Sequence, residues 1–251
     1  MKNPSSGRSE NIVALIFLLL VVLVISLTVY WQAERLLPKD IVLMIKPETL
    51  YYEQKAHSEM KNDLVIAFNI FQQGQKQEAI TRAEKIYERG KNYFDGRQPD
   101  FNDPRDRLIS DRILATSSWL AGWNTNDAAL SRSYAQTAYE HSLGLNGETD
   151  FWTVSHLYDV GSRSLDLREY DKALTAYSEI VDIYARNKAS DFSDLDRVIK
   201  AHVQTARLQL RNRNAQGTLQ TIQKIFDVAD KDAKKDLTKL YKRASLLKRS
   251  R

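Results

Sequence analysis

Histidines and carboxylates are the side chains of this 251-residue chain that could carry acid–base or metal chemistry, and their spacing favours neither. The four histidines, His57, His141, His156 and His202, fall on separate predicted helices. No HExxH, glycine-rich phosphate loop or GxSxG motif occurs. The chain has no cysteine, which excludes disulfides, thiolate zinc sites and cysteine nucleophiles. We therefore expect no catalytic residue, no metal and no cofactor, and predict that the protein is not an enzyme.

The acidic residues near the C-terminal end could form a calcium-binding loop. A calcium-binding loop that began at Asp227 would need glycine at its sixth position and glutamate at its twelfth. Asp232 and Thr238 stand at those positions, so the calcium site is rejected. Other acidic pairs, such as Glu148 with Asp150, precede apolar stripes. Carboxylates at such places cap helix N-termini, and that structural role is what we predict for them.

The net charge of +5 is concentrated at the C-terminal end. Residues 229–251 carry nine Lys or Arg against three Asp, which leaves the remaining residues nearly neutral. A basic protein of this kind could suggest nucleic acid as a partner, but the basicity belongs to the tail alone. Only Tyr241 interleaves an aromatic ring with these charges, which argues against nucleic acid.

A run of uncharged apolar residues near the N-terminus predicts a membrane anchor. Residues 12–31 read IVALIFLLLVVLVISLTVYW, and 20 helical residues span about 30 Å, the thickness of the hydrocarbon core of a bilayer. We predict a transmembrane helix over 12–32, after a tail over 1–11. Its characteristic residues are Ile12, Leu19, Val24, Tyr30 and Trp31, the last two being rings that prefer the headgroup level.

Two alternatives bear on this segment. A cleaved signal peptide should have a shorter apolar run of about 7–15 residues that ends in small side chains, whereas this run ends in bulky ones. The orientation depends on a nearly balanced count of basic residues on the two sides. The short N-terminal tail with Lys2 and Arg8, together with the absence of cysteine, favours a cytoplasmic N-terminus. The rest of the chain is then expected on the outer face of the cell (inner) membrane, in the periplasm of a bacterium with two membranes.

Beyond a juxtamembrane linker over 33–47, which contains Pro38 and Pro47, the sequence reads as helices. Within the linker, residues 41–44 are the only ambiguous candidate for a strand. Apolar residues at helical spacing form a first stripe that ends at Gly74 and a second that ends at Gly90, with a long loop predicted over 91–103. Asp103 followed by Pro104 predicts the start of a helix. Further helices are predicted over 108–120, 126–143 (stopped by Gly144 and Gly147), 149–167 (capped by Thr149), 169–185, 194–210, 217–228 and 234–248.

Small residues recur near the start of every second predicted helix. Ala79, Ala128, Ala173 and Thr218 lie 49, 45 and 45 residues apart. The clearest unit consists of Leu157, Gly161, Leu165, Tyr170, Ala173, Tyr177 and Ile180. A small residue flanked by large ones at a helix crossing is typical of closely packed helical hairpins. Ala67, Thr116 and Ala206 hold the place of Gly161 in the other units.

This pattern resembles the tetratricopeptide repeat (TPR) family, and residues 145–185 resemble the longer repeats of kinesin light chains. The resemblance covers roughly residues 60–228. It departs from the family at Val160, where the family has Leu, and in a period longer than the usual 34 residues. The expected fold is therefore all-α: a single transmembrane helix, a TPR-like α-solenoid of about four hairpins over 48–228, and a basic C-terminal helix over 229–251.

The resemblance also implies a surface for a protein partner. If the geometry of the family carries over, the concave groove is lined by Gln72, Ser117, Tyr158, Ser162, Arg207 and Arg211. TPR modules that grip the C-terminal carboxylate of a partner use Lys and Asn where this chain has Leu64 and Phe68. This departure argues against a receptor for chaperone tails. Tryptophans and tyrosines in these hairpins are expected mainly in the core, with some of them open to the groove.

The basic tail leaves three interpretations open. It could cap the solenoid by burying Leu237, Leu240 and Leu247, adsorb to anionic lipid headgroups, or bind nucleic acid. The sequence as a whole favours a membrane-anchored scaffold or adaptor subunit that binds proteins of a membrane or envelope complex. The alternatives are an accessory periplasmic chaperone for exported clients, and a cytoplasm-facing scaffold whose tail binds lipid.

Overall fold

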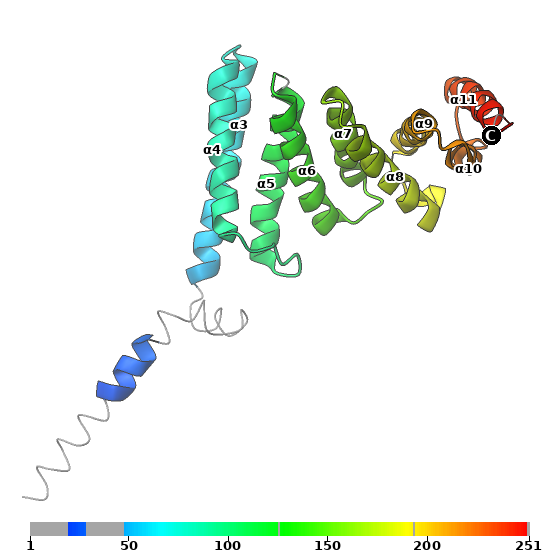
Figure 1. Cartoon of the computed structure of the whole chain (residues 1–251). Coiled ribbons are helices and arrows are strands. Elements are labelled where there is room, and N and C mark those ends of the chain that lie inside the picture. Colours follow the sequence, from blue (N-terminus) through cyan, green and yellow to red (C-terminus); the bar gives the residue numbers. More distant parts are fainter. Residues whose placement is uncertain (1–19, 29–47, 125, 193, 250–251) are drawn as a thin grey trace, which may run out of the picture. The chain divides into compact units, whose positions relative to one another are not determined.

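The computed structural model describes residues 20–28, 48–124, 126–192 and 194–249. Every regular element in these ranges is helical, which confirms the all-α expectation for the described part of the chain (Figure 1). The long helices are α3 (Glu48–Gln72), α4 (Lys76–Phe94), α5 (Pro104–Trp123), α6 (Ala128–Asn146), α7 (Phe151–Asp166), α8 (Tyr170–Arg186), α9 (Leu195–Arg211), α10 (Ala215–Ile225) and α11 (Lys231–Arg249). A short 3-10 helix, Ala189–Asp191, precedes α9.

The chain divides into two compact units, Met1–Ala56 and His57–Arg251. In the first unit, residues 20–28 are helical and their apolar side chains are exposed, with Val24 at 60%. The other expected anchor residues (Ile12, Leu19, Tyr30 and Trp31), the tail over 1–11 and the linker over 33–47 lie outside the described residues. Across the described ranges, no helix combines the length and the apolar character needed to cross a bilayer.

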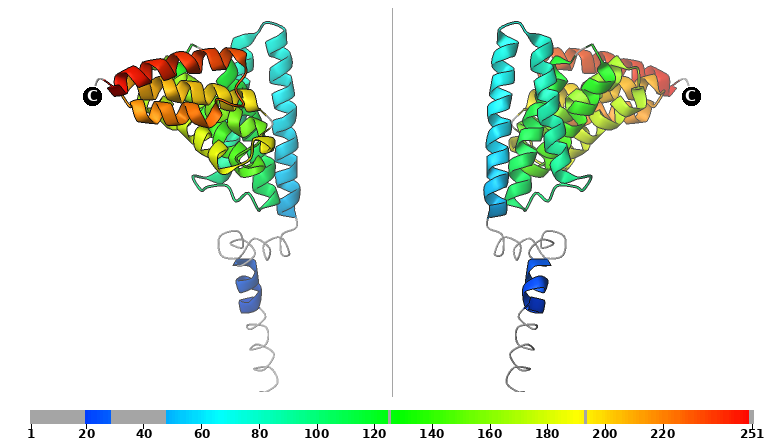
Figure 2. Two further views of the ribbon diagram at one scale, coloured as in Figure 1. Left: turned by 90° about the vertical axis from the view of Figure 1, so that its right-hand side faces the viewer. Right: turned by 90° about the vertical axis from the view of Figure 1, so that its left-hand side faces the viewer.

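In the second unit, each helix from α4 to α11 packs against the next one along the chain, as the two views of Figure 2 show. The alternate helices α7, α9 and α11 also contact each other in turn. The connections are short, so consecutive helices form antiparallel hairpins. One core of mainly aliphatic and tyrosine side chains runs through the stack, from Met60 to Leu240.

Aspartates start several of these helices. Asp103 accepts a hydrogen bond from the amide of Arg105 with Pro104 in the first turn, as predicted. Helix α7 begins one residue later than expected, because Asp150 rather than Thr149 accepts from the amide of Trp152, at 2.8 Å. Each cap satisfies a backbone donor that the helix itself leaves unpaired.

Two glycines that were expected to stop helices lie inside them. Gly90 is buried within α4, which continues to Phe94, and Gly144 lies within α6, which continues to Asn146. A Cβ atom at Gly90 would collide with the side chain of Ile113, and one at Gly144 would collide with the ring of Phe101. The glycines therefore permit close packing between helices and loops, while the loop predicted over 91–103 is shortened to 95–103.

The recurring small residues are buried at helix crossings in most units. Ala79, Ala173 and Thr218 are each 0% exposed. The second unit is the exception, since Ala128 is only partly buried. Ser131 takes the buried position there, and its hydroxyl donates a hydrogen bond of 2.8 Å to the carbonyl of Ala121 on α5.

Helix α11 covers the end of the described stack. It packs against α9 and α10 and buries Leu237, Leu240 and Ala244, whereas Leu247 is only partly buried. Most of its lysines and arginines remain exposed. The tail thus has the packing of a capping helix, and its basic face remains open to solvent.

Candidate partner-binding surfaces

The structure places Tyr158 and Ser162, two of the six predicted groove residues, on one side of α7, both partly exposed. The ring of Tyr158 lies 5.2 Å from the ring of Tyr177. Tyr158 therefore contacts the core while part of its side chain remains open to solvent. These two predicted positions are therefore accessible together on one helix.

Ser117 is not accessible to a partner. It is 0% exposed, and its hydroxyl donates to the carbonyl of Ile113 at 2.8 Å. Helix α5 is covered by both α4 and α6, so its buried face is wider than a single stripe. The next residue, Ser118, is partly exposed, and Gln72 is exposed at the end of α3.

The two predicted arginines are already engaged within the chain. Arg207 pairs with Asp236 of α11, with 2.6 Å between Nη2 and Oδ2. The guanidinium of Arg211 lies 3.6 Å from the ring centre of Tyr170. Each contact is solvent-exposed and weak enough for a partner to displace.

Arg207 borders a charged hollow of about 390 Å³ between α9 and α11, the α9–α11 hollow. Ile199 and Val203 form its apolar floor. Its rim carries an ion pair of 2.6 Å between Lys200 and Asp196. The charges of both signs within one rim largely neutralise each other, so this hollow offers no net charge for selecting a partner.

A second hollow, of about 600 Å³, lies between α6, α7 and α8, the α6–α8 hollow. Leu157, Val160 and Ala176 form the apolar part of its lining. On one side, the hydroxyl of Tyr139 donates to the carboxylate of Glu179 at 2.5 Å. Burial, together with this carboxylate, raises the pKa of Tyr139, which keeps the phenol protonated.

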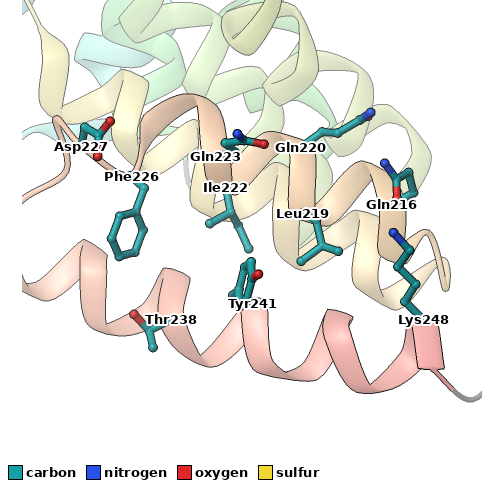
Figure 3. A pocket seen from close by; sticks show the side chains of 10 residues that line it. All are labelled: Gln216, Leu219, Gln220, Ile222, Gln223, Phe226, Asp227, Thr238, Tyr241 and Lys248. Carbon is teal, nitrogen blue, oxygen red and sulfur yellow. The ribbon is translucent and has the colours of Figure 1, made fainter.

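A third hollow, of about 690 Å³, lies between α10 and α11, the α10–α11 hollow (Figure 3). Leu219 and Ile222 of α10, and Phe226 directly after it, point toward Tyr241 and Thr238 of α11 across the gap. This surface was not predicted from the sequence. The signal that could have found it is the exposed flank of α11, where Thr238, Tyr241 and Lys248 recur at helical spacing beside the buried leucines.

Three of the four histidines are structural. His141, His156 and His202 are all buried, at 9%, 4% and 0% exposure. Burial lowers the pKa of each to about 4, which keeps the imidazoles neutral. Across the described residues, no group of three or more His, Cys, Asp or Glu side chains is arranged to hold a metal ion.

The tryptophans divide between core and surface. Trp119 is partly buried and lies edge-on to Phe71, with 6.1 Å between ring centroids. Trp123 is 41% exposed while it contacts the same phenylalanine at 4.4 Å. Trp152 is 53% exposed and stacks on His156 at 5.7 Å.

No family model matches the sequence, and no curated protein is similar to it. Among the solved structures that match are two crystal structures of one protein. One is that of a protein from Podosopora anserina described as a kinesin light chain with nearly identical TPR-like repeats: it is 11% identical, covers 76% of this chain and 92% of its own length, and has a TM-score of 0.46. The other, a single-substitution variant of that protein, is also 11% identical, covers 77% and 93%, and has a TM-score of 0.47. The assignment of these helices to a stack of hairpins therefore rests on the contacts between helices within this chain.

Proposed function

We propose that this chain is a non-enzymatic, membrane-anchored scaffold that holds a protein partner within a membrane or envelope complex. The observation that carries the proposal is the form of the second unit. Its helices share one continuous core, and between them lie three hollows that combine apolar floors with polar rims. Rigid helices that frame such hollows are suited to holding a peptide segment or a helix of another protein.

The membrane part of the proposal rests on the sequence. Residues 12–31 carry no charged side chain, and within that run the described residues 20–28 are helical with exposed apolar side chains. An anchor would confine the scaffold to two dimensions and raise its effective concentration near membrane partners. The basic residues of the N-terminal tail and the absence of cysteine support a cytoplasmic N-terminus with the helical unit outside the inner membrane.

The exposed basic face of α11 favours a second candidate, a cytoplasm-facing scaffold whose tail adsorbs to anionic lipid. The two candidates differ in topology. The chain has no cysteine of its own, so a single cysteine placed at the exposed Gly96 reports its side of the membrane cleanly. With the outer membrane permeabilised, labelling of intact cells by an impermeant maleimide supports the outer location. Labelling only after lysis supports the cytoplasmic one.

The scaffold function is tested by affinity purification of the full chain from membranes in a mild detergent. We expect one partner in constant stoichiometry. Many substoichiometric clients would instead indicate the accessory chaperone, and the absence of any bound protein would contradict the proposal.

A further inference from the structure

The α10–α11 hollow occupies a distinctive position in the stack. Helices α5, α7 and α9 each pack against both the preceding helix and the following one. Helix α11 packs against α10 and α9, and no described helix follows it. The hollow therefore lies beside the last described helix, where α11 faces α10.

The floor of the hollow is apolar and partly open. Ile222 is 3% exposed at its base, while Phe226 is 37% and Tyr241 is 52% exposed. Figure 3 shows these side chains facing one another across the gap, with Leu219 beside them. Large apolar side chains that are left half-exposed around a concave floor are typical of surfaces that bind another protein.

The surroundings of this floor are basic. Helix α11 carries eight Lys or Arg against two Asp. Lys248 lines the hollow, and Lys231, Lys242 and Arg249 follow one another along the adjacent side of the helix at helical spacing. On the facing segment, the polar part of the lining consists of three glutamines and the carboxylate Asp227, which offsets Lys248. The excess positive charge therefore lies beside the lining, on the adjacent side of α11.

We propose that the α10–α11 hollow binds an amphipathic helix of a partner protein, with apolar residues on its inner face and acidic residues beside α11. The inner face would fill the space over Phe226 and Tyr241, while its carboxylates would pair with the basic stripe. This inference rests on the proposed scaffold function and specifies the surface and the chemistry of the partner.

The shape of the surface favours a helix over a lipid bilayer. The deepest apolar residue, Ile222, lies at the bottom of a hollow of about 690 Å³, where a flat headgroup layer cannot reach it. A bilayer would instead contact exposed residues of α11 outside the hollow, such as Leu246 and Arg243. The two kinds of partner therefore depend on different residues of the same helix.

The test uses the full chain in neutral detergent micelles and a fluorescent peptide. The probe is a designed amphipathic helix of about 18 residues, with Leu on one face and Glu on the other, and the control peptide has the same composition in scrambled order. We expect saturable binding by fluorescence anisotropy, with the scrambled peptide at least about tenfold weaker.

Three substitutions assign the binding to the hollow. Thr238→Trp fills the hollow from an exposed position, and Lys248→Glu reverses a charge in its lining. Each should weaken the peptide at least about tenfold, which corresponds to about 1.4 kcal/mol. The matched control, Arg243→Glu, makes the same charge change on the opposite side of α11 and should alter the affinity less than about twofold.

Three outcomes would overturn the inference: equal binding of the ordered and scrambled peptides, equal weakening by both charge reversals, or full binding to Thr238→Trp. Stronger binding of the chain to vesicles with about 30% phosphatidylglycerol than to vesicles of phosphatidylcholine alone, without binding of the peptide, would assign the surface to lipid instead, because the anchor contributes equally to both. The partner purified in detergent separates the two proposals. If Thr238→Trp retains that partner fully, this inference fails while the scaffold function stands; if no partner is found at all, the scaffold function itself fails.

Discussion

Gly161 provides the sharpest test of the helix packing. It is buried in α7, and a Cβ atom at this position would lie 2.7–3.0 Å from ring carbons of Tyr177 on α8. Tyr177 is itself 1% exposed and has little room to move. Gly161→Ala should therefore force a shift that costs about 1–3 kcal/mol, as overpacking of a core does.

Alanine also gains helix propensity over glycine, by about 0.5–1 kcal/mol, so the net loss in the free energy of unfolding should be about 1.3 kcal/mol and no more than about 2.5 kcal/mol. With a urea m value of about 2 kcal/mol/M, the midpoint of denaturation should fall by about 0.6 M. Urea denaturation of the full chain in micelles, followed by helical circular dichroism, measures this shift.

Gly122→Ala is the matched control. Gly122 also lies within a helix, α5, but a Cβ atom there would meet nothing within 4 Å. The substitution should leave the midpoint unchanged or raise it slightly. If Gly161→Ala were as neutral or as stabilising as this control, the close contact of α7 with α8 would be wrong, and with it the hairpin packing at the centre of the fold.

Three further predictions concern pH, the loop before α5 and the anchor. Lowering the pH from 8 to 5 should reduce the free energy of unfolding by about 2 kcal/mol for each of His141, His156 and His202. Their pKa of about 4 in the folded state lies below the unfolded value of about 6.5, so protons bind preferentially to the unfolded chain. An unchanged urea midpoint at pH 5 would contradict this. Asp106→Ala should lower the free energy of unfolding by about 2–3 kcal/mol. The carboxylate is 0% exposed, accepts a hydrogen bond of 2.7 Å from a backbone amide and forms an ion pair with an arginine. A thermal midpoint equal to that of the wild type would refute this prediction. Deletion of residues 1–37 should release a soluble, mainly helical protein, and its retention in a salt-washed membrane pellet would argue against a single anchor.

The helices could be predicted because apolar residues recur at 3.6-residue spacing and aspartates mark several starts. Their ends were harder to place. Gly90 and Gly144 looked like stops, yet both serve contacts with side chains distant in sequence. Conversely, Arg168 and Arg213 adopt the left-handed conformation after their helices, a role that their residue type does not signal.

The candidate surfaces were less predictable than the helices. Aligning Ser117 with Ser162 assumed that each first helix of a hairpin exposes the same side, but Ser117 lies on a buried side of α5, whereas Ser162 lies on a partly exposed side of α7. The α10–α11 hollow depends on how α11 rests on its neighbours, which the pattern of one helix does not determine. The sequence does contain one sign of this hollow, because Tyr241 is an aromatic residue that stands among lysines.

The central claim, that this chain holds a protein partner on its helical unit, is tested most directly by photocrosslinking in intact cells. A benzoylphenylalanine is placed at one exposed lining residue of each hollow: Thr238, Thr175 or Lys200. We predict a discrete crosslinked band of one partner in the membrane fraction, strongest from Thr238. The absence of a discrete protein crosslink from all three positions would contradict the account.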